Sequence, residues 1–176
     1  MTSMINIFRY PSSTMSLTTG DQNFWRYHMK VKELIHHKLE TMEPTATAKD
    51  IAIKMRDLNI GAIPIVHANQ VLGIVTDRDL TINVLAKREN PEKINAKDFM
   101  TKNVQTCFDD DEVEKCAEIM AQKQIRRCLV LDHMSKKPVG VISLRDLALG
   151  TGTKNLAGDI LLKVEKAQRA TQLASR

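Results

Sequence analysis

Two short segments of the chain repeat a hydroxyl residue that is followed three positions later by an aspartate. Thr76 precedes Asp79 in one segment and Ser143 precedes Asp146 in the other, each after an apolar run that begins at a glycine. A carboxylate accepts hydrogen bonds from two vicinal hydroxyls and a neighbouring Ser or Thr donates one more, so this pairing suits a ribose. The spacing is also that of a helix capping box, in which the same side chains bond to backbone N–H groups. The residues alone leave both interpretations open.

A pair of arginines, Arg126 and Arg127, precedes the apolar run 128–131. Arginine binds phosphate through a planar fork of N–H donors, and a helix start nearby would add backbone donors. Successive strand residues point to opposite faces, so at least one arginine faces the ligand side of the sheet or a subunit interface. The matching place earlier in the chain holds Gly61 and Ala62, which leave room but carry no charge. Two related but unequal sites are therefore predicted.

The two segments belong to an internal duplication. A shift of 65 residues lays 63–66 on 128–131, and after a two-residue insertion a shift of 67 lays Gly73 on Gly140. Two copies are too few for a solenoid, so they indicate two units related by a pseudo-two-fold axis. The predicted division is an N-terminal arm, 1–28; repeat 1, 29–90; repeat 2, 91–150; and a C-terminal helical tail, 151–176.

Each repeat has the predicted order β-α-β-β-α after a short helical turn. In repeat 1 an apolar stripe at helical spacing follows Thr47, which is a candidate N-cap with Asp50 three residues on; in repeat 2 Asp111 and Glu114 are given the same roles. Each unit is too small to bury both faces of its sheet, so an α/β (α+β) fold with the two sheets packed together is expected. The expected elements are helical turns at 32–35 and 96–100, extended pieces at 39–42 and 104–107, strands at 62–66, 71–75, 128–131 and 139–142, and last helices that begin at Thr76 and Ser143.

The basic excess of the chain lies outside the repeats. The formal net charge is +5, but residues 31–150 carry equal numbers of basic and acidic side chains. This distribution argues against nucleic acid as the main partner, although binding through the tails stays open. No apolar run approaches the about 18 residues of a membrane span, and no cationic start precedes an apolar block, so neither a membrane nor a secretory signal is expected.

The three cysteines, Cys107, Cys116 and Cys128, form no CxxC pair. This pattern argues against a disulfide framework or a zinc site and favours buried thiols in a reducing cytoplasm. The chain also has no phosphate-binding Walker loop, HExxH segment or nucleophile elbow, so no enzymatic activity and no metal are predicted.

The two tails give separate predictions. The segment 24–27 is aromatic and basic, and it either docks on the rest of the chain or a sister subunit or binds a partner. The C-terminal tail has apolar residues at helical spacing, which predict a helix packed on the repeats or on a second copy. These apolar residues are Leu156, Ile160, Leu161, Val164 and Ala167.

These features resemble a tandem pair of cystathionine β-synthase (CBS) domains, the arrangement called a Bateman module, of a stand-alone bacterial type. The resemblance covers about residues 29–150 and rests on 59–66 with 73–80 and on 124–132 with 140–147. It implies a flat homodimer that buries the helices 50–58 and 77–86 and their equivalents in repeat 2. It also implies a regulatory role, in which a bound nucleotide changes the shape or dimer state of the protein and thereby signals to another protein.

The resemblance further implies that an adenosine-containing ligand binds in the cleft between the repeats: AMP, ADP or ATP, with S-adenosylmethionine or NAD as alternatives. Carried over, Thr76 with Asp79 and Ser143 with Asp146 would hold the ribose and the first phosphate. Arg126 and Arg127 would reach the phosphates. The apolar residues that would flank the adenine are Ile63, Pro64, Cys128 and Leu129. A ligand-free dimerisation or scaffold module is the alternative from another functional class.

Overall fold

The structure is a computed structural model that describes residues 29–150 together with 158, 161, 162 and 166. The predicted arm 1–28 lies outside the described residues, as does most of the predicted tail helix, of which the four described residues are helical. The elements of repeat 1 are the 3-10 helix η2, Val31–Leu34; α1, Ala48–Leu58; β1, Ala62–His67; β2, Gln70–Thr76; α2, Asp77–Asp79; and the π-helix η3, Leu80–Leu85. Those of repeat 2 are α3, Ala96–Phe99; β3, Thr106–Phe108; α4, Val113–Lys123; β4, Arg127–Leu131; β5, Pro138–Ser143; and α5, Leu144–Gly150.

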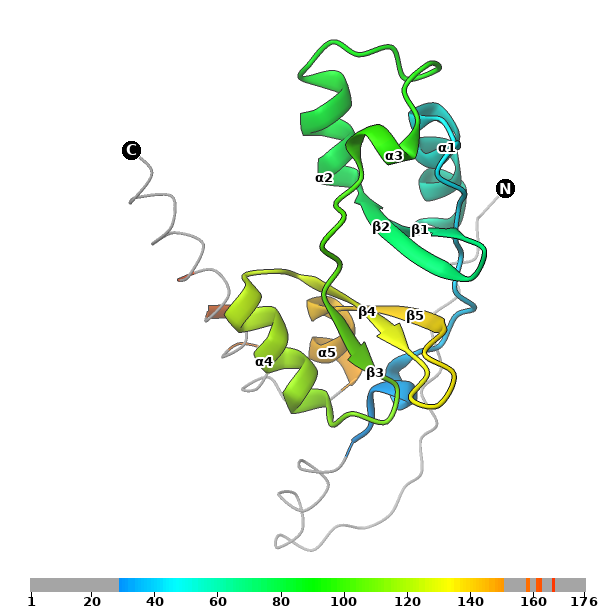
Figure 1. Ribbon diagram of the computed structural model, residues 1–176. Coiled ribbons are helices and arrows are strands. Elements are labelled where there is room, and N and C mark those ends of the chain that lie inside the picture. Colours follow the sequence, from blue (N-terminus) through cyan, green and yellow to red (C-terminus); the bar gives the residue numbers. More distant parts are fainter. Residues whose placement is uncertain (1–28, 151–157, 159–160, 163–165, 167–176) are drawn as a thin grey trace, which may run out of the picture.

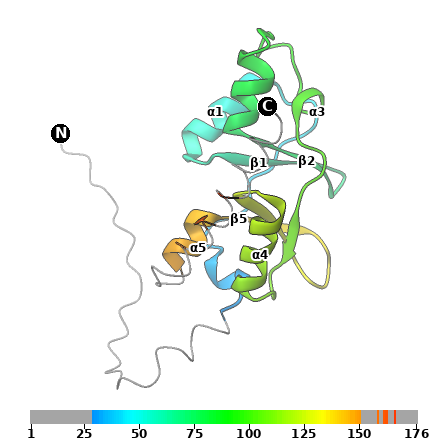
Figure 2. The same ribbon diagram turned by 90° about the vertical axis from the view of Figure 1, so that its left-hand side faces the viewer.

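Each repeat is built around an antiparallel hairpin, β1 with β2 in repeat 1 and β4 with β5 in repeat 2. Figure 1 and Figure 2 show the two hairpins facing each other across the middle of the described part, with the helices on the outer sides. The predicted packing of sheet against sheet is confirmed. Each sheet therefore has one face toward its own helices and one toward the other sheet.

Each unit has its own hydrophobic core, because the apolar side of α1 packs against the hairpin of repeat 1 and the apolar side of α4 packs against the hairpin of repeat 2. The first core contains the buried side chains of Ala48, Ile51, Met55, Ile63, Ile65, Val75, Val84, Ala96 and Phe99. The second core contains those of Val31, Leu34, Cys107, Val113, Cys116, Ala117, Met120, Cys128, Val130, Ile142 and Leu147.

Backbone details confirm the duplication. Helix α1 ends at Asn59 and α4 at Gln124, both in the left-handed conformation with φ of 52° and 54°. The first strand of each hairpin carries an irregularity at the same place, between residues 65 and 66 and between residues 130 and 131. Both pairs of positions are 65 residues apart, so the two repeats share a backbone and not only a hydrophobic pattern.

The predicted start is confirmed for α1 and wrong for α4. The Thr47 hydroxyl accepts a hydrogen bond from the Asp50 N–H at 3.1 Å, as an N-cap does. In repeat 2 the N-cap is Glu112, with no side-chain cap bond. Asp111 cannot serve because its carboxylate closes the turn after β3, where it accepts from the Phe108 N–H at 2.9 Å.

The first strand of the predicted order is present in repeat 2 only. Strand β3 runs parallel to β4, whereas the expected extended piece of repeat 1 is reduced to a single bridge between Met42 and Ile65. Two prolines explain the difference, because proline has no N–H to donate. In repeat 2 the N–H groups of Leu129 and Asp109 donate hydrogen bonds of 3.0 and 2.9 Å at the two ends of the β3–β4 pairing. The matching residues of repeat 1 are Pro64 and Pro44.

The short helix that leads each repeat packs on the other repeat. Residues Val31 and Leu34 of η2 are buried in the second core, and the Val31 N–H donates to the Asp111 carbonyl at 2.9 Å. Helix α3 lies in the first core, where the Ala96 N–H donates to the Ala46 carbonyl at 2.8 Å. Each hydrophobic core therefore includes a helix from the other repeat. The predicted division between residues 90 and 91 separates the two sequence repeats and not the two cores.

Candidate functional site

The two hydroxyl–aspartate pairs form capping boxes with nearly equal geometry. The Thr76 hydroxyl donates to Asp79 Oδ2 at 2.7 Å and accepts from the Asp79 N–H at 3.2 Å, while the Thr76 N–H donates to the same carboxylate oxygen at 2.8 Å. Ser143 and Asp146 repeat this pattern with distances of 2.6, 3.3 and 2.8 Å. The capping interpretation is thus realised in both repeats.

A capping box does not use up these groups. All four side chains are partly exposed, and in each aspartate the printed bonds use only Oδ2. Within the described residues, Oδ1 of each carboxylate is left to accept from a ligand hydroxyl. The box holds the carboxylate in a fixed orientation at the end of a strand, so capping and binding of a vicinal diol are compatible.

Both pairs begin on the sheet faces that look into the cleft. In the hairpins, Thr76 is registered opposite Ala62 and Ser143 opposite Arg127. Side chains alternate along a strand, and residues paired across antiparallel strands share a face. The cleft face is therefore formed by Ala62, Pro64, Ile74 and Thr76 from repeat 1 and by Arg127, Leu129, Val141 and Ser143 from repeat 2.

This alternation corrects two of the four residues expected to flank the adenine. Ile63 and Cys128 are buried in the first and second cores, so their side chains point away from the cleft. Pro64 and Leu129 are buried but belong to neither core, as cleft-face residues should. Ile74 and Ala62 were missed, although strand alternation puts Ile74 on the face of Thr76, two residues later, and Ala62 on the face of Pro64, two residues later.

The arginine of β4 crosses the cleft. Arg127 Nη2 lies 3.7 Å from Asp77 Oδ2 of repeat 1, with the two side chains 32% and 64% exposed. The guanidinium fits there because residue 61 is glycine: a Cβ on Gly61 would lie 2.7 Å from Arg127 Nη2. Arg126 occupies the position that corresponds to Gly61 and is exposed. Its expected contact with a phosphate stays a prediction.

Two hollows in the described part of the surface are lined by neither of the hydroxyl–aspartate pairs. One, of about 380 Å³, opens between the hairpin tips and is lined by residues that include Val71, Leu129 and Leu131. A larger one, of about 490 Å³, is lined by η3, α3 and the connection 86–95. The first is lined by Leu129, one of the residues expected to flank the adenine; the second is lined by no predicted site residue. The chemistry of the repeated motif therefore locates the candidate site better than the size of a hollow does.

The three cysteines meet in the second core, where all are buried and free. Hydrogen bonds with Cys107 and Cys128, together with burial, raise the pKa of the Cys116 thiol above its usual range. A thiol held protonated in an apolar core is a packing group and not a nucleophile. Their predicted burial is confirmed.

Neither a cluster of metal ligands nor a membrane-spanning helix is found in the part of the chain that the structure describes. Among the described residues, no group of histidine, cysteine, aspartate and glutamate side chains is arranged to hold a metal ion. Within the same part of the chain, every helix is too short or too polar to cross a bilayer.

Comparison with protein families gives one clear match: the family model described as CBS domain fits residues 31–85 and 96–149. Among curated proteins, the chain is 36% identical over 120 residues to the uncharacterized protein MK0525 of Methanopyrus kandleri, covering 68% of this chain and 61% of that one. It is 35% identical over 140 residues to the uncharacterized protein YlbB of Bacillus subtilis, covering 78% and 92% of the two chains.

Solved structures agree with this match. The CBS domain protein PAE2072 of Pyrobaculum aerophilum, complexed with AMP, has a TM-score of 0.65 at 22% identity and covers 76% of this chain and 99% of its own. The CBS domain pair of protein MJ0100, in complex with 5′-methylthioadenosine and S-adenosyl-L-methionine, has a TM-score of 0.64 at 26% identity, with coverages of 72% and 98%.

Proposed function

The chain belongs to the CBS domain family, and from this premise we propose that it is a regulatory module that binds an adenosine-containing nucleotide between its two repeats. The observation that carries the proposal is the pair of matched hydroxyl–aspartate boxes on facing sheets. Each leaves one carboxylate oxygen for a ribose diol. That PAE2072 holds AMP and MJ0100 holds two adenosyl compounds supports the same class of ligand.

In this proposal Thr76 with Asp79 and Ser143 with Asp146 bind the ribose, and the apolar cleft residues Pro64 and Leu129 contact the base. AMP, ADP and ATP are the leading candidates. A ligand that touches both sheets favours one spacing of the repeats over another, because it binds the two arrangements with different affinity. Such a shift would be read by another protein, so the chain is proposed to be a cytoplasmic regulator and not an enzyme.

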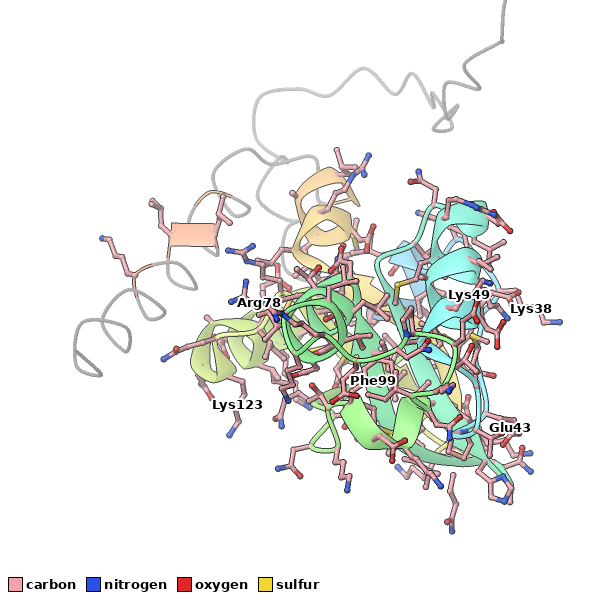
Figure 3. All side chains as sticks on the ribbon, turned by 90° about the horizontal axis from the view of Figure 1, so that it is seen from above. Lys38, Glu43, Lys49, Arg78, Phe99 and Lys123 are labelled. Atoms are coloured by element: carbon pink, nitrogen blue, oxygen red, sulfur yellow. The ribbon has the colours of Figure 1, made fainter. Side chains whose placement is uncertain are left out.

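We also propose that two copies pair through the outer helices of repeat 1. Leu58 of α1 and Leu85 of η3 are 46% and 65% exposed. In repeat 2 the residue that corresponds to Leu58 is Lys123, on the exposed end of α4 in Figure 3. Repeat 2 exposes Leu149 of α5 to 55%, but the lysine in place of Leu58 makes its outer surface less apolar, which favours pairing of repeat 1 with repeat 1. Sedimentation of the intact chain tests this: a dimer that Leu85→Lys converts to monomer supports it, and a monomeric wild type contradicts it.

Calorimetric titration of the intact chain with AMP, ADP, ATP, NAD and S-adenosylmethionine tests the nucleotide proposal. Binding of at least one of them is expected, together with a rise in melting temperature, because a ligand that binds the folded state stabilises it. No heat and no thermal shift with any of them would favour the ligand-free scaffold. In that case Asp79→Ala and Asp146→Ala would alter stability alone.

A further inference from the structure

We propose that the hollow beside the last helix of repeat 1 binds a free amino acid with an apolar side chain. This hollow, of about 490 Å³, is lined by η3, α3 and the connection 86–95, and by none of the residues proposed to bind the nucleotide. The connection lies at the end of the described part that is remote from repeat 2 (Figure 1). The hollow is therefore a second site, and its assignment does not depend on the proposed function.

The hollow has no counterpart in repeat 2, because the matching place there is filled. Two of its lining residues, Asn83 of η3 and Phe99 of α3, correspond to Gly150 of α5 and Leu34 of η2. A Cβ on Gly150 would collide with the Leu34 side chain, so the leucine occupies the place of the missing side chain. The same pair of helices is thus closely packed in repeat 2 and leaves a hollow in repeat 1.

The wall of the hollow that η3 forms has an unusual backbone. From Leu80 to Leu85 the chain is a π-helix, whereas α5 at the matching place of repeat 2 is an α-helix. The Ala86 N–H donates to the Thr81 carbonyl, five residues back, at 2.9 Å. Turns of π-helix are rare and occur frequently at functional sites. The segment that departs from the duplicated pattern is the one that carries Asn83, a lining residue.

The wall that the connection 86–95 forms is ordered by hydrogen bonds. The Asn90 side chain accepts from the Glu92 N–H at 2.9 Å. The Asn90 carbonyl accepts from the N–H groups of Lys93 and Ile94 at 3.0 and 3.1 Å. The Ile94 carbonyl accepts from the Ala48 N–H, at the start of α1, at 3.0 Å. A hollow with ordered walls binds a ligand at a smaller cost in conformational entropy.

Charged side chains of both signs line the hollow. Among the described residues, the ammonium groups of Lys87 and Lys93 and the carboxylate of Glu89 have neither a hydrogen bond nor an ion pair. Asp98 has one hydrogen bond, from the Asn95 N–H to its Oδ2 at 3.2 Å, which leaves its Oδ1 for a ligand. Two cationic and two anionic groups are therefore placed to meet a ligand.

This lining fits a zwitterion that has an apolar side chain. The two lysines suit the α-carboxylate of an amino acid, and the carboxylates of Glu89 and Asp98 suit its α-ammonium group. Phe99, which is 6% exposed, and the half-buried Ile94 supply apolar surface for its side chain. A phosphate or a nucleotide carries negative charge alone and would meet the two carboxylates, and a metal ion would meet the two ammonium groups.

Mapping of backbone amide shifts by NMR on the intact chain tests the proposal with L-leucine, L-methionine and L-phenylalanine. At about 10 mM amino acid, a site with a Kd of about 1 mM is about nine-tenths occupied. At least one of the three is expected to shift the amides of residues 83–99 and to leave those of the hairpins unchanged. No shift with any of them, or shifts spread evenly over the chain, would contradict the proposal.

Analogues of the amino acid that binds best test the need for both charges. Its amide lacks the carboxylate and its deaminated acid lacks the ammonium group. Each is expected to bind about 5-fold more weakly or worse, because one pair of charged partners is lost. If either analogue bound as well as the amino acid, the hollow would not recognise a zwitterion.

The double variant Lys87→Gln, Lys93→Gln tests the assigned residues. It is expected to weaken amino-acid binding by about 5-fold or more, because both cationic partners of the carboxylate are removed. Lys97→Gln is the matched control, since Lys97 is an exposed lysine of α3 that does not line the hollow. All three lysines are exposed, so the melting temperature should not change. Equal affinities of the double variant and the control would overturn the assignment.

The amino-acid site and the nucleotide site fail separately. The variant Asp79→Asn, Asp146→Asn is expected to keep its affinity for the amino acid, and loss of that affinity would place the amino acid in the cleft and overturn the proposal. A wild-type chain that binds an amino acid at the hollow and no nucleotide contradicts the proposed function alone. One that binds AMP and no amino acid contradicts the present proposal alone.

Discussion

Repeat 1 and repeat 2 share a backbone and differ at the entrance of their hairpins. The left-handed ends of α1 and α4, the strand irregularities and the two capping boxes match position by position. At the hairpin entrance, however, repeat 1 has Ala62 where repeat 2 has Arg127, and Asp77 where repeat 2 has Leu144. Duplication has kept the two hydroxyl–aspartate boxes, which are proposed to bind a ribose, and has changed the residues beside them. Two sites of one origin can therefore prefer different ligands.

The largest expected difference between the repeats lies in their cores. Ile63→Ala should lower the free energy of unfolding by about 2–5 kcal/mol, because it leaves a cavity at a fully buried position. Cys128→Ala, at the matching position of repeat 2, removes a single sulfur atom and should cost about 1 kcal/mol. Urea unfolding measures both. If instead Ile63→Ala keeps its stability and loses nucleotide affinity, then Ile63 faces the cleft after all.

The strand glycines give the next difference, since each meets the residues that directly follow the leading helix of the opposite repeat. A Cβ on Gly73 would lie 2.8 Å from the Thr101 carbonyl oxygen, which is backbone and cannot turn aside. The three atoms nearest to a Cβ on Gly140 all belong to the side chain of Ile35, the first at 2.9 Å. Gly73→Ala should therefore cost about 1–3 kcal/mol of unfolding free energy, and Gly140→Ala clearly less. Equal losses of unfolding free energy would contradict this ranking, because they would show that the two neighbouring segments yield equally to an added methyl group.

The smallest expected effect is at Gly61. The atoms nearest to its added Cβ belong to the ends of the partly exposed Arg127 and Asp77 side chains, which can move. Gly61→Ala should change the unfolding free energy by less than about 0.5 kcal/mol. Thermal unfolding of Gly61→Ala and Gly73→Ala side by side checks the ranking. A loss of stability in Gly61→Ala as large as that in Gly73→Ala would mean that the Arg127–Asp77 contact holds the repeats together.

Much of the fold could be predicted from periodicity and the internal duplication. The helices α1 and α4 and both hairpins follow from apolar spacing that is strong and occurs twice. The sequence did not show that the extended piece 39–42 would shorten to a single bridge at Met42. The effect of Pro44 and Pro64 depends on which N–H groups donate in the strand pairing, and this is known only from the structure. The exchange of η2 and α3 was also missed, since a four-residue helix carries no pattern that says which core it enters.

The geometry of the hydroxyl–aspartate boxes could be predicted from the sequence, whereas the direction of two of the four apolar side chains could not. The boxes at Thr76 and Ser143 were visible because spacing alone defines them. Ile63 and Cys128 were assigned to the cleft by resemblance, whereas strand alternation puts them in the cores. The contact of Arg127 with Asp77 joins residues 50 positions apart on facing sheets, and no local pattern encodes such a pair.

The most direct measurement is AMP titration of the wild type beside the double variant Asp79→Asn, Asp146→Asn. The two substitutions keep the shape of both boxes and remove the charged acceptors that are proposed to bind ribose. The proposed function predicts heat with the wild type and a loss of affinity of about 10-fold or more in a double variant that melts cooperatively. A folded double variant that binds AMP as the wild type does would contradict it.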